Sequence, residues 1–456
     1  MKRYEALDFL RGISIFGMVL CSVIPYGVLP GWMYHIQTPP PTHAVDLTLV
    51  GLSWVDLVFP VFIFCMGVAI SLSGHKKLSA TGKDDHKEIT KSYLLHTFER
   101  FLLLWLFSYL YVMLNYGNLD SPGAWLLTIA GFLSLFPIYM IVKNSRYRVW
   151  IRVAGMLLSA VIIYFGHTIY EEVVSINRSG IIIFLLAFLY LFASVIWFYT
   201  RKNIRIRAAI FAILILFAAI TMHYEFAQKL YKIESVKWFF NIEYIYFLMI
   251  LLPATWLGDM LVKRLEDKSP ISVSPQFAAI SLFMVAWQCY ALYMRIFWIN
   301  IAVTVAMLAA IYYFIKRGSS GWADLFYVSS VMLLAGLIID PLEGGIQKSP
   351  CTISYCLVTF SCGVYLLWFS AWFSARFGKS AIFKIFTGSG GNPLMSYIAY
   401  NSFMMPLFKL TGFIFIYKAA FPQSHPWIGV ASAALFVLIM MWGVTLLTDR
   451  KIIWRA

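Results

Sequence analysis

The chain has 456 residues, of which 61% are hydrophobic, 18% aromatic and only 12% charged, and its mean hydropathy is +0.77. A soluble domain carries about a quarter charged residues, so this composition excludes a soluble globular protein. The net charge is +15, but the Lys and Arg residues gather in alternate loops between apolar segments. That distribution is typical of membrane topology and argues against a nucleic-acid-binding protein.

The apolar segments are continuous and recur along the whole chain. Each has about 17–25 residues, the length that crosses a bilayer as an α-helix, whereas a transmembrane β-barrel would alternate apolar and polar residues. The sequence therefore predicts an all-α, polytopic integral membrane helical bundle with roughly 10–14 transmembrane helices. No loop is long enough for a separate soluble domain, so we expect residues 1–456 to form one transmembrane domain.

In chain order, the spans with two assignable limits are Phe9–Val28, Trp54–Ser73, Phe101–Asn115, Ala124–Val142, Gly180–Tyr199 and Thr352–Phe373. The remaining limits lie near His167, Met222, Gly258, Arg295, Asp340, Pro393 and Asp449, which gives about fourteen spans in all. The basic segments at both ends of the chain and in the loop after Ser73 place these parts on the inner side. Both termini are thus predicted to be cytoplasmic, and the first span to be retained rather than cleaved.

Six cysteines are present, most of them within the apolar segments, and none forms a C-x-x-C pair. They predict packed thiols rather than a disulfide framework. The H-x-x-x-H and H-E-x-x-H patterns that hold zinc are also absent. We therefore expect no metal site.

The loop before the second span combines two histidines with the run Pro39-Pro40-Pro41. Histidine titrates near neutral pH and can take a proton from an amine or a hydroxyl, and prolines stiffen the backbone around it. Asp56 follows a few residues into the span, where a buried carboxylate needs a partner. We predict His43, His35 and Asp56 as catalytic residues; the alternative is that a histidine only organises the loop.

A second external group of carboxylates, Asp340 and Glu343, comes at the end of a span and precedes two glycines. Carboxylates in this position could bind an amine or the hydroxyls of a sugar. The alternative is an ordinary solvated turn.

On the inner side, Asp8 and Arg11 are three residues apart and should pair on one face of the first helix. Basic residues at the same membrane level, including Lys263 and Arg264, could hold the phosphates of a nucleotide-type donor. The positive-inside rule alone could also account for most of them. Asn392 follows a glycine-rich run before a span, which fits a helix amino terminus open to an anion.

Two segments near the amino terminus, EALDFLRGISIFGMVL and GLSWVDLVFPVFIFCMGVAISLS, resemble the opening of the heparan-α-glucosaminide N-acetyltransferase family and its bacterial relatives. The later segments KSPCTISYCLVTFSCG and GGNPLMSYI are similar to the family's carboxyl-terminal part. The matches occur in the family's order, and the DLVFP block is the most specific of them.

The resemblance implies a transmembrane acetyltransferase of a bacterial inner membrane. Acetyl-CoA would bind from the cytoplasm, and the acetyl group would reach the amine of a glucosamine-type or glycosaminoglycan-type sugar on the other side. The protein would contact membrane lipids and no nucleic acid, and could form a homodimer. Asp8, Arg11, Asn392, Lys263 and Arg264 would contact the donor.

The family's active histidine precedes the aspartate of the DLVFP block by a short loop. His43 is the nearer candidate here and the favoured one, His35 is the other, and Asp46 occupies the family's usual position. Asp46, Asp340 and Glu343 would then hold the sugar.

Two other functions fit the same fold. An amino-sugar transporter would move the sugar without consuming acetyl-CoA, and an O-acyltransferase of an envelope polysaccharide would transfer the acyl group to a hydroxyl.

Overall fold

The computed structural model describes residues 4–80, 86–141, 145–171, 174–175, 177–223, 242–266, 273–318 and 322–455. Over these ranges the chain is helical, with no strand and an isolated β-bridge between Met140 and Trp454. Eleven helices of the described part are long and apolar enough to cross a membrane. The predicted polytopic helical bundle is thereby confirmed.

The first part of the chain forms α1 (Glu5–Cys21), η1 (Gly31–Met33), α2 (Trp54–Ala80), α3 (His86–Met113), α4 (Pro122–Tyr139), α5 (Ser145–Tyr170), α6 (Ile181–Thr200), α7 (Ile204–His223) and η3 (Ile242–Phe247). The second part forms α9 (Leu248–Glu266), α10 (Pro275–Tyr293), α11 (Phe297–Gly318), α12 (Ala323–Ile339), η5 (Asp340–Glu343), α13 (Ile353–Phe377), α14 (Ala381–Gly390), α15 (Pro393–Ala399), the π-helical turn η6 (Tyr400–Met404), α16 (Met405–Thr411), α17 (Ile414–Ala419) and α18 (Pro426–Asp449).

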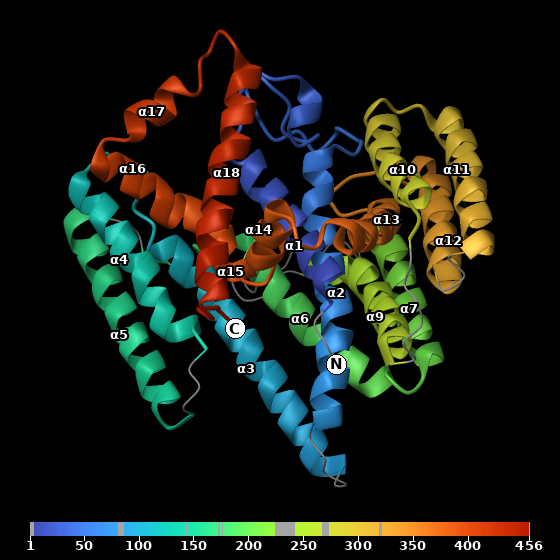
Figure 1. Ribbon diagram of the computed structural model, residues 1–456, viewed down its shortest axis with the longest axis horizontal. Coiled ribbons are helices and arrows are strands. Elements are labelled where there is room, and N and C mark those ends of the chain that lie inside the picture. The colour runs from blue at the N-terminus through green and yellow to red at the C-terminus, as the bar shows by residue number, and fades with distance from the viewer. Residues whose placement is uncertain are drawn as a thin grey trace.

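Four helices, α2, α6, α9 and α13, bury most of their residues within the bundle, whereas α5, α7, α11 and α18 bury only a minority of theirs. Figure 1 shows α5 and α11 at opposite sides of the molecule. Helix α2 packs closely on α9 because both carry glycine at the crossing. A Cβ atom on Gly67 would lie 2.6 Å from the Leu251 carbonyl oxygen, and one on Gly258 would lie 2.8 Å from that of Val68. Small residues allow membrane helices to approach in this way.

The predicted span Phe101–Asn115 belongs to the longer helix α3, which begins at His86. Two other predicted spans are cut short or interrupted by turns of the backbone. Helix α1 ends at Cys21 rather than near Val28, because the chain turns ahead of Pro25. The span predicted to begin near Pro393 is interrupted: α15, a π-helical turn and α16 run to Thr411, and Gly412 then takes φ +77° before α17. Single-turn π segments interrupt α-helices in this manner, frequently at functional sites.

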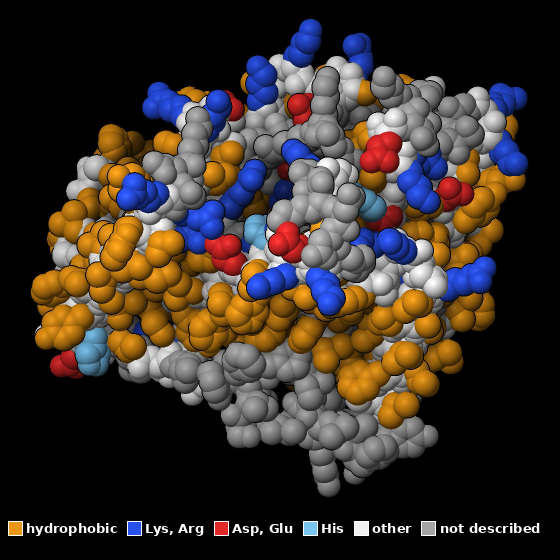
Figure 2. Space-filling model, turned by 90° about the horizontal axis from the view of Figure 1, so that it is seen from below, with side chains coloured by type: hydrophobic (Ala, Val, Ile, Leu, Met, Phe, Trp, Pro, Cys, Tyr) orange, Lys and Arg blue, Asp and Glu red, His pale blue; other side chains and the backbone are white. Residues whose placement is uncertain are grey.

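The two ends of the bundle are chemically different. We call the end that carries residues 22–53 and 340–352 the loop face, and the end that carries the basic residues 74–80, 86–100 and 146–152 the basic face. In Figure 1 the loop of residues 22–53 lies at the top, α2 and α3 extend to the bottom, and both chain ends lie in the lower half. Figure 2 views the molecule from below and shows Lys and Arg side chains gathered around a hollow.

Candidate active site

A histidine–carboxylate pair lies at the loop face, where α2 begins. His35 Nδ1 is 2.6 Å from Asp56 Oδ1, and the other carboxylate oxygen accepts hydrogen bonds from the Ile36 amide (3.1 Å) and the Ser53 hydroxyl (2.9 Å). The Asp56 side chain is buried and that of His35 is 37% exposed. A carboxylate on Nδ1 stabilises the tautomer with its proton on that nitrogen, so Nε2 is left as the acceptor.

Helix α13 fixes this pair from the opposite side. The Tyr355 hydroxyl donates a 2.7 Å hydrogen bond to the backbone carbonyl of Asp56. The pair is therefore held by a loop and two helices, while His35 Nε2 has no partner among the described residues. Sequence reasoning missed Tyr355, although it belongs to a quoted motif, because nothing in the sequence relates it to Asp56.

His43, which the sequence favours as the catalytic histidine, has a different environment. Its Nδ1 lies 3.0 Å from the Thr38 carbonyl oxygen, and its Nε2 lies 3.1 Å from the Gly27 amide, which donates to it. The ring packs against Tyr26 and Tyr34, with ring centroids 4.0 and 4.5 Å away. Both nitrogens are thus occupied by backbone groups, and this geometry suits a residue that organises the loop.

The carboxylates expected to hold a sugar already have internal partners. Asp340 is buried and accepts hydrogen bonds from Arg295 Nη1 (3.0 Å) and the Ile346 amide. Glu343 accepts from the first amides of α13, at 2.8 and 2.9 Å, and so caps that helix. Asp46 lies at the surface, and hydrogen bonds from Thr48 lower the pKa of its carboxyl group.

The predicted pair of Asp8 and Arg11 is confirmed on α1. Arg11 Nη1 lies 3.0 Å from Asp8 Oδ1 and 3.2 Å from the carbonyl oxygen of Gly390, at the end of α14. Both side chains line a cavity of about 670 Å³ that opens at the basic face. The mouth of this basic cavity contains six cationic side chains and two carboxylates, namely Arg11, Lys76, Arg100, Arg148, Arg152, Arg455, Asp8 and Glu99.

Part of this charge is neutralised within the mouth. Glu99 accepts from Arg148 (3.0 Å) and Arg152 (2.7 Å), while Arg100 lies over the Tyr190 ring, 4.5 Å from its centroid. The excess of cations over carboxylates still leaves a positive mouth that suits a polyanion such as a phosphorylated donor.

The inner part of the basic cavity is apolar and points toward the histidine–carboxylate pair. Its lining includes Met18 on α1 and Phe62 on α2. Phe62 comes six residues after Asp56, which is about 9 Å along a helix axis. Cys21, one turn beyond Met18, lies within electrostatic range of Asp56. A slender chain entering from the basic face would therefore extend toward His35.

Three residues expected to contact the donor lie outside the lining of the basic cavity. Asn392 is buried and binds the carboxyl-terminal segment: its Nδ2 donates to the Ile452 carbonyl oxygen (3.0 Å), and its Oδ1 accepts from the Trp454 amide (3.0 Å). Arg264 lies 3.7 Å from Asp324, and Lys263 is its neighbour at the end of α9.

Another buried polar cluster joins α2, α6, α7 and α9. Asp259 accepts from His75 Nε2 (2.9 Å), Trp197 Nε1 (2.9 Å) and Arg207 Nη1 (2.7 Å), and also from the Ser71 hydroxyl. These hydrogen bonds occupy the Asp259 carboxylate and link α9 to α2, α6 and α7, so the cluster has a structural role. No local spacing in the sequence predicts this cluster, because its members lie up to 188 residues apart.

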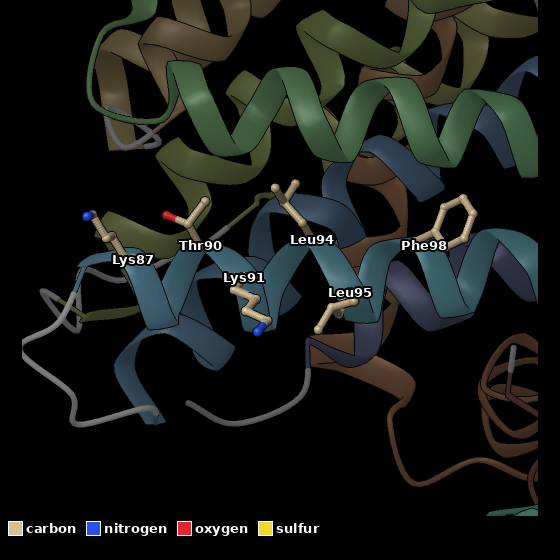
Figure 3. A pocket seen from close by; sticks show the side chains of 6 residues that line it. All are labelled: Lys87, Thr90, Lys91, Leu94, Leu95 and Phe98. Atoms are coloured by element: carbon tan, nitrogen blue, oxygen red, sulfur yellow. The ribbon is translucent and has the colours of Figure 1, made fainter.

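An open recess of about 580 Å³ runs along α3, apart from both features (Figure 3). It is lined by two lysines, one threonine and three apolar side chains: Lys87, Lys91, Thr90, Leu94, Leu95 and Phe98. It holds no carboxylate or histidine that could transfer a proton. Across the described ranges, no group of three or more His, Cys, Asp or Glu residues is arranged to hold a metal ion.

Comparison with known proteins gives a family but no activity. Residues 3–261 match the family described as a domain of unknown function (DUF5009). The chain belongs to this family. The match includes His35, Asp56 and the mouth of the basic cavity up to Arg152, and it ends before α13. A comparison with curated proteins finds no match.

Proposed function

We propose that this DUF5009 protein is a transmembrane acetyltransferase. It takes the acetyl group of acetyl-CoA from the basic cavity and transfers it to the amine of a glucosamine-type sugar at the loop face. The observation that supports this best is the His35–Asp56 pair, in which one ring nitrogen is held by a buried carboxylate and the other is open. The positive mouth on the opposite face is where CoA phosphates would bind.

In this proposal His35 is the general base. Its Nε2 accepts a proton as the amine nitrogen attacks the thioester carbonyl carbon, and Asp56 stabilises the resulting imidazolium. The carbon–sulfur bond then breaks, and the imidazolium returns the proton to the leaving thiolate. The products are an amide and the CoA thiol. Transfer through an acetylated Nε2 is the other route, in which the imidazole is the nucleophile.

The test is CoA release from acetyl-CoA by the purified protein in proteoliposomes, with glucosamine as acceptor. We expect wild-type turnover and a loss of about 10³-fold for His35→Ala, since a positioned base contributes roughly 10²–10⁴-fold. His425→Ala is the matched control, because His425 is an exposed histidine whose ring contacts the Ser424 hydroxyl, and its loss should leave turnover unchanged.

Three outcomes would count against the proposal. Absence of turnover with every amino sugar tested would reject the enzyme, and sugar uptake without CoA release would indicate a transporter. Turnover with hydroxyl acceptors but not with amines would mean that the enzyme is an O-acyltransferase rather than an N-acetyltransferase. Radiolabelled acetyl retained on the protein without acceptor, and lost in His35→Ala, would identify the covalent route.

A further inference from the structure

Two buried cysteines touch each other at the loop face, where α13 begins. Cys351 Sγ lies 3.3 Å from Cys356 Sγ, and the two residues are 3% and 0% exposed. Cys351 directly precedes Thr352, the residue that caps α13, and Cys356 lies in the first turn of that helix. In the described part of the chain, the other four cysteines make no sulfur–sulfur contact.

The cap of α13 holds the two thiols against each other. The Thr352 hydroxyl accepts from the Tyr355 amide (3.3 Å), and the Thr352 carbonyl oxygen accepts from the Cys356 amide (3.2 Å). Cysteines whose side chains point apart cannot be bridged without movement of the backbone. Here the sulfur atoms already lie in contact across a fixed helix start, so the geometry permits a bond between them.

The pair can exist in two forms, and the side of the membrane decides between them. As thiols, the two side chains would pack as the sequence predicts, with Cys356 Sγ also 3.5 Å from the Tyr246 carbonyl oxygen. The positive-inside rule, however, assigns the basic face to the cytoplasm and so leaves the loop face on the outer side. Disulfides form and persist in that kind of compartment.

We infer that Cys351 and Cys356 form a disulfide bond as the loop face enters an oxidising compartment. The oxidant is the disulfide of a thiol–disulfide exchange protein. One cysteine thiolate attacks that disulfide to give a mixed disulfide, and the second thiolate then attacks the bound cysteine sulfur and releases the oxidant as a dithiol. The two cysteines lose two electrons in all, and their two protons end on the thiols of the oxidant. Because both sulfur atoms are buried in the folded protein, the exchange precedes the packing of α13.

The bond would tie the segment before α13 to the first turn of that helix. The same segment holds the loop that carries His35: the Ser349 amide donates to Gln37 Oε1 (3.1 Å), and Gln347 Nε2 donates to the Leu47 carbonyl oxygen (2.8 Å). A covalent link would therefore fix the support of this loop. The inference concerns the folding of the loop face and does not depend on acetyl transfer.

The test counts free thiols in the full-length protein as it stands in the cell. Bacteria with an oxidising periplasm produce the protein and are quenched in acid before lysis, which protonates thiols and stops exchange. The protein is then denatured and labelled with a maleimide that carries a polyethylene glycol chain, with and without prior reduction. Of the six cysteines, we expect four to be labelled without reduction and six after it. Mass spectrometry of the unreduced protein should place the bond between Cys351 and Cys356.

Serine variants identify the partners. Cys351→Ser and Cys356→Ser should each show five labelled cysteines with and without reduction. Cys362→Ser is the matched control, because it removes a buried thiol from the same helix, and it should keep the difference of two between reduced and unreduced samples. Six labelled cysteines in the unreduced wild type, or a bond mapped to any other pair, would overturn the inference. The counts are made on denatured chains, so they do not require that a variant folds.

Discussion

His35 and His43 lie eight residues apart in one loop, but their ring nitrogens have different partners. His35 uses one nitrogen to bind a buried carboxylate and leaves the other open. His43 binds the backbone of Thr38 and Gly27 with its two nitrogens. A base needs an accessible lone pair, so in this loop His35 suits proton transfer and His43 suits structural support.

Replacing His43 by alanine should therefore cost stability rather than chemistry. The change leaves the Gly27 amide without its acceptor, and losing such a bond costs about 1–3 kcal/mol. We expect a lower unfolding temperature for His43→Ala in detergent, and turnover of the folded fraction within about threefold of wild type. His35→Ala should show the opposite behaviour. A stable His43→Ala protein that has lost turnover would return His43 to the mechanism.

At the scale of single residues, the sequence predicts paired side chains better than it predicts which of the two histidines, His35 or His43, carries the chemistry. The spacing of Asp8 and Arg11 on a helix was sufficient to predict their bond, because helical geometry alone brings them together. Asp56 was also expected to need a partner, and in the structure that partner is His35. The choice of His35 depends on contacts such as Gln37 with Ser349, which are 312 residues apart, and no local pattern contains them.

At the scale of helices, hydropathy predicts where the chain crosses the membrane, because span length follows from bilayer thickness. The helices on either side of Arg295, α10 and α11, agree with that prediction. Hydropathy does not predict the interruption between Pro393 and Ala419, since a π-helical turn and a glycine with positive φ change the backbone without changing its polarity. It also does not show which helices line the basic cavity: no residue of α9, Lys263 and Arg264 included, belongs to its lining.

The crossing of α1 and α14 positions Arg11. A Cβ atom on Gly390 would lie 1.9 Å from the Asp8 carbonyl oxygen and 2.7 Å from the Gly12 nitrogen. The two backbones approach each other at this point because glycine leaves the space open. The carbonyl oxygen of Gly390 in turn accepts from Arg11. Packing of two helices and placement of a cavity cation therefore depend on one residue.

Gly390→Ala should disturb both the packing of α1 on α14 and the position of Arg11. The added methyl group meets backbone atoms, which cannot rotate away, and overpacking of this kind typically costs about 1–3 kcal/mol. We expect a lower unfolding temperature together with a raised KM for acetyl-CoA, measured by thermal unfolding and CoA release. Gly443→Ala on α18 is the control, because nothing lies within 4 Å of its Cβ position. Equal behaviour of the two variants would show that the crossing tolerates a methyl group.

At the scale of the whole molecule, the charges and the histidine–carboxylate pair lie on opposite faces. The charged residues of the basic cavity come from α1, α2, α3, α5 and the carboxyl-terminal segment. In Figure 1, α2 and α3 extend to the lower end of the bundle, whereas the loop with His35 lies at the upper end. The apolar part of the cavity lies between them. This arrangement suits two substrates that meet without sharing a compartment, and it gives the proposed reaction a direction.

That direction can be tested with sealed proteoliposomes, because neither acetyl-CoA nor a glucosamine disaccharide crosses an intact bilayer readily. Acetyl-CoA is added outside, and the disaccharide is placed either inside or outside. Molecules with the basic face outward should acetylate the enclosed disaccharide and leave the external one unmodified. Detergent, which opens both compartments, should remove the difference. Comparable acetylation of an external disaccharide in sealed vesicles would mean that donor and acceptor enter from the same face, and the cavity would then require a different role.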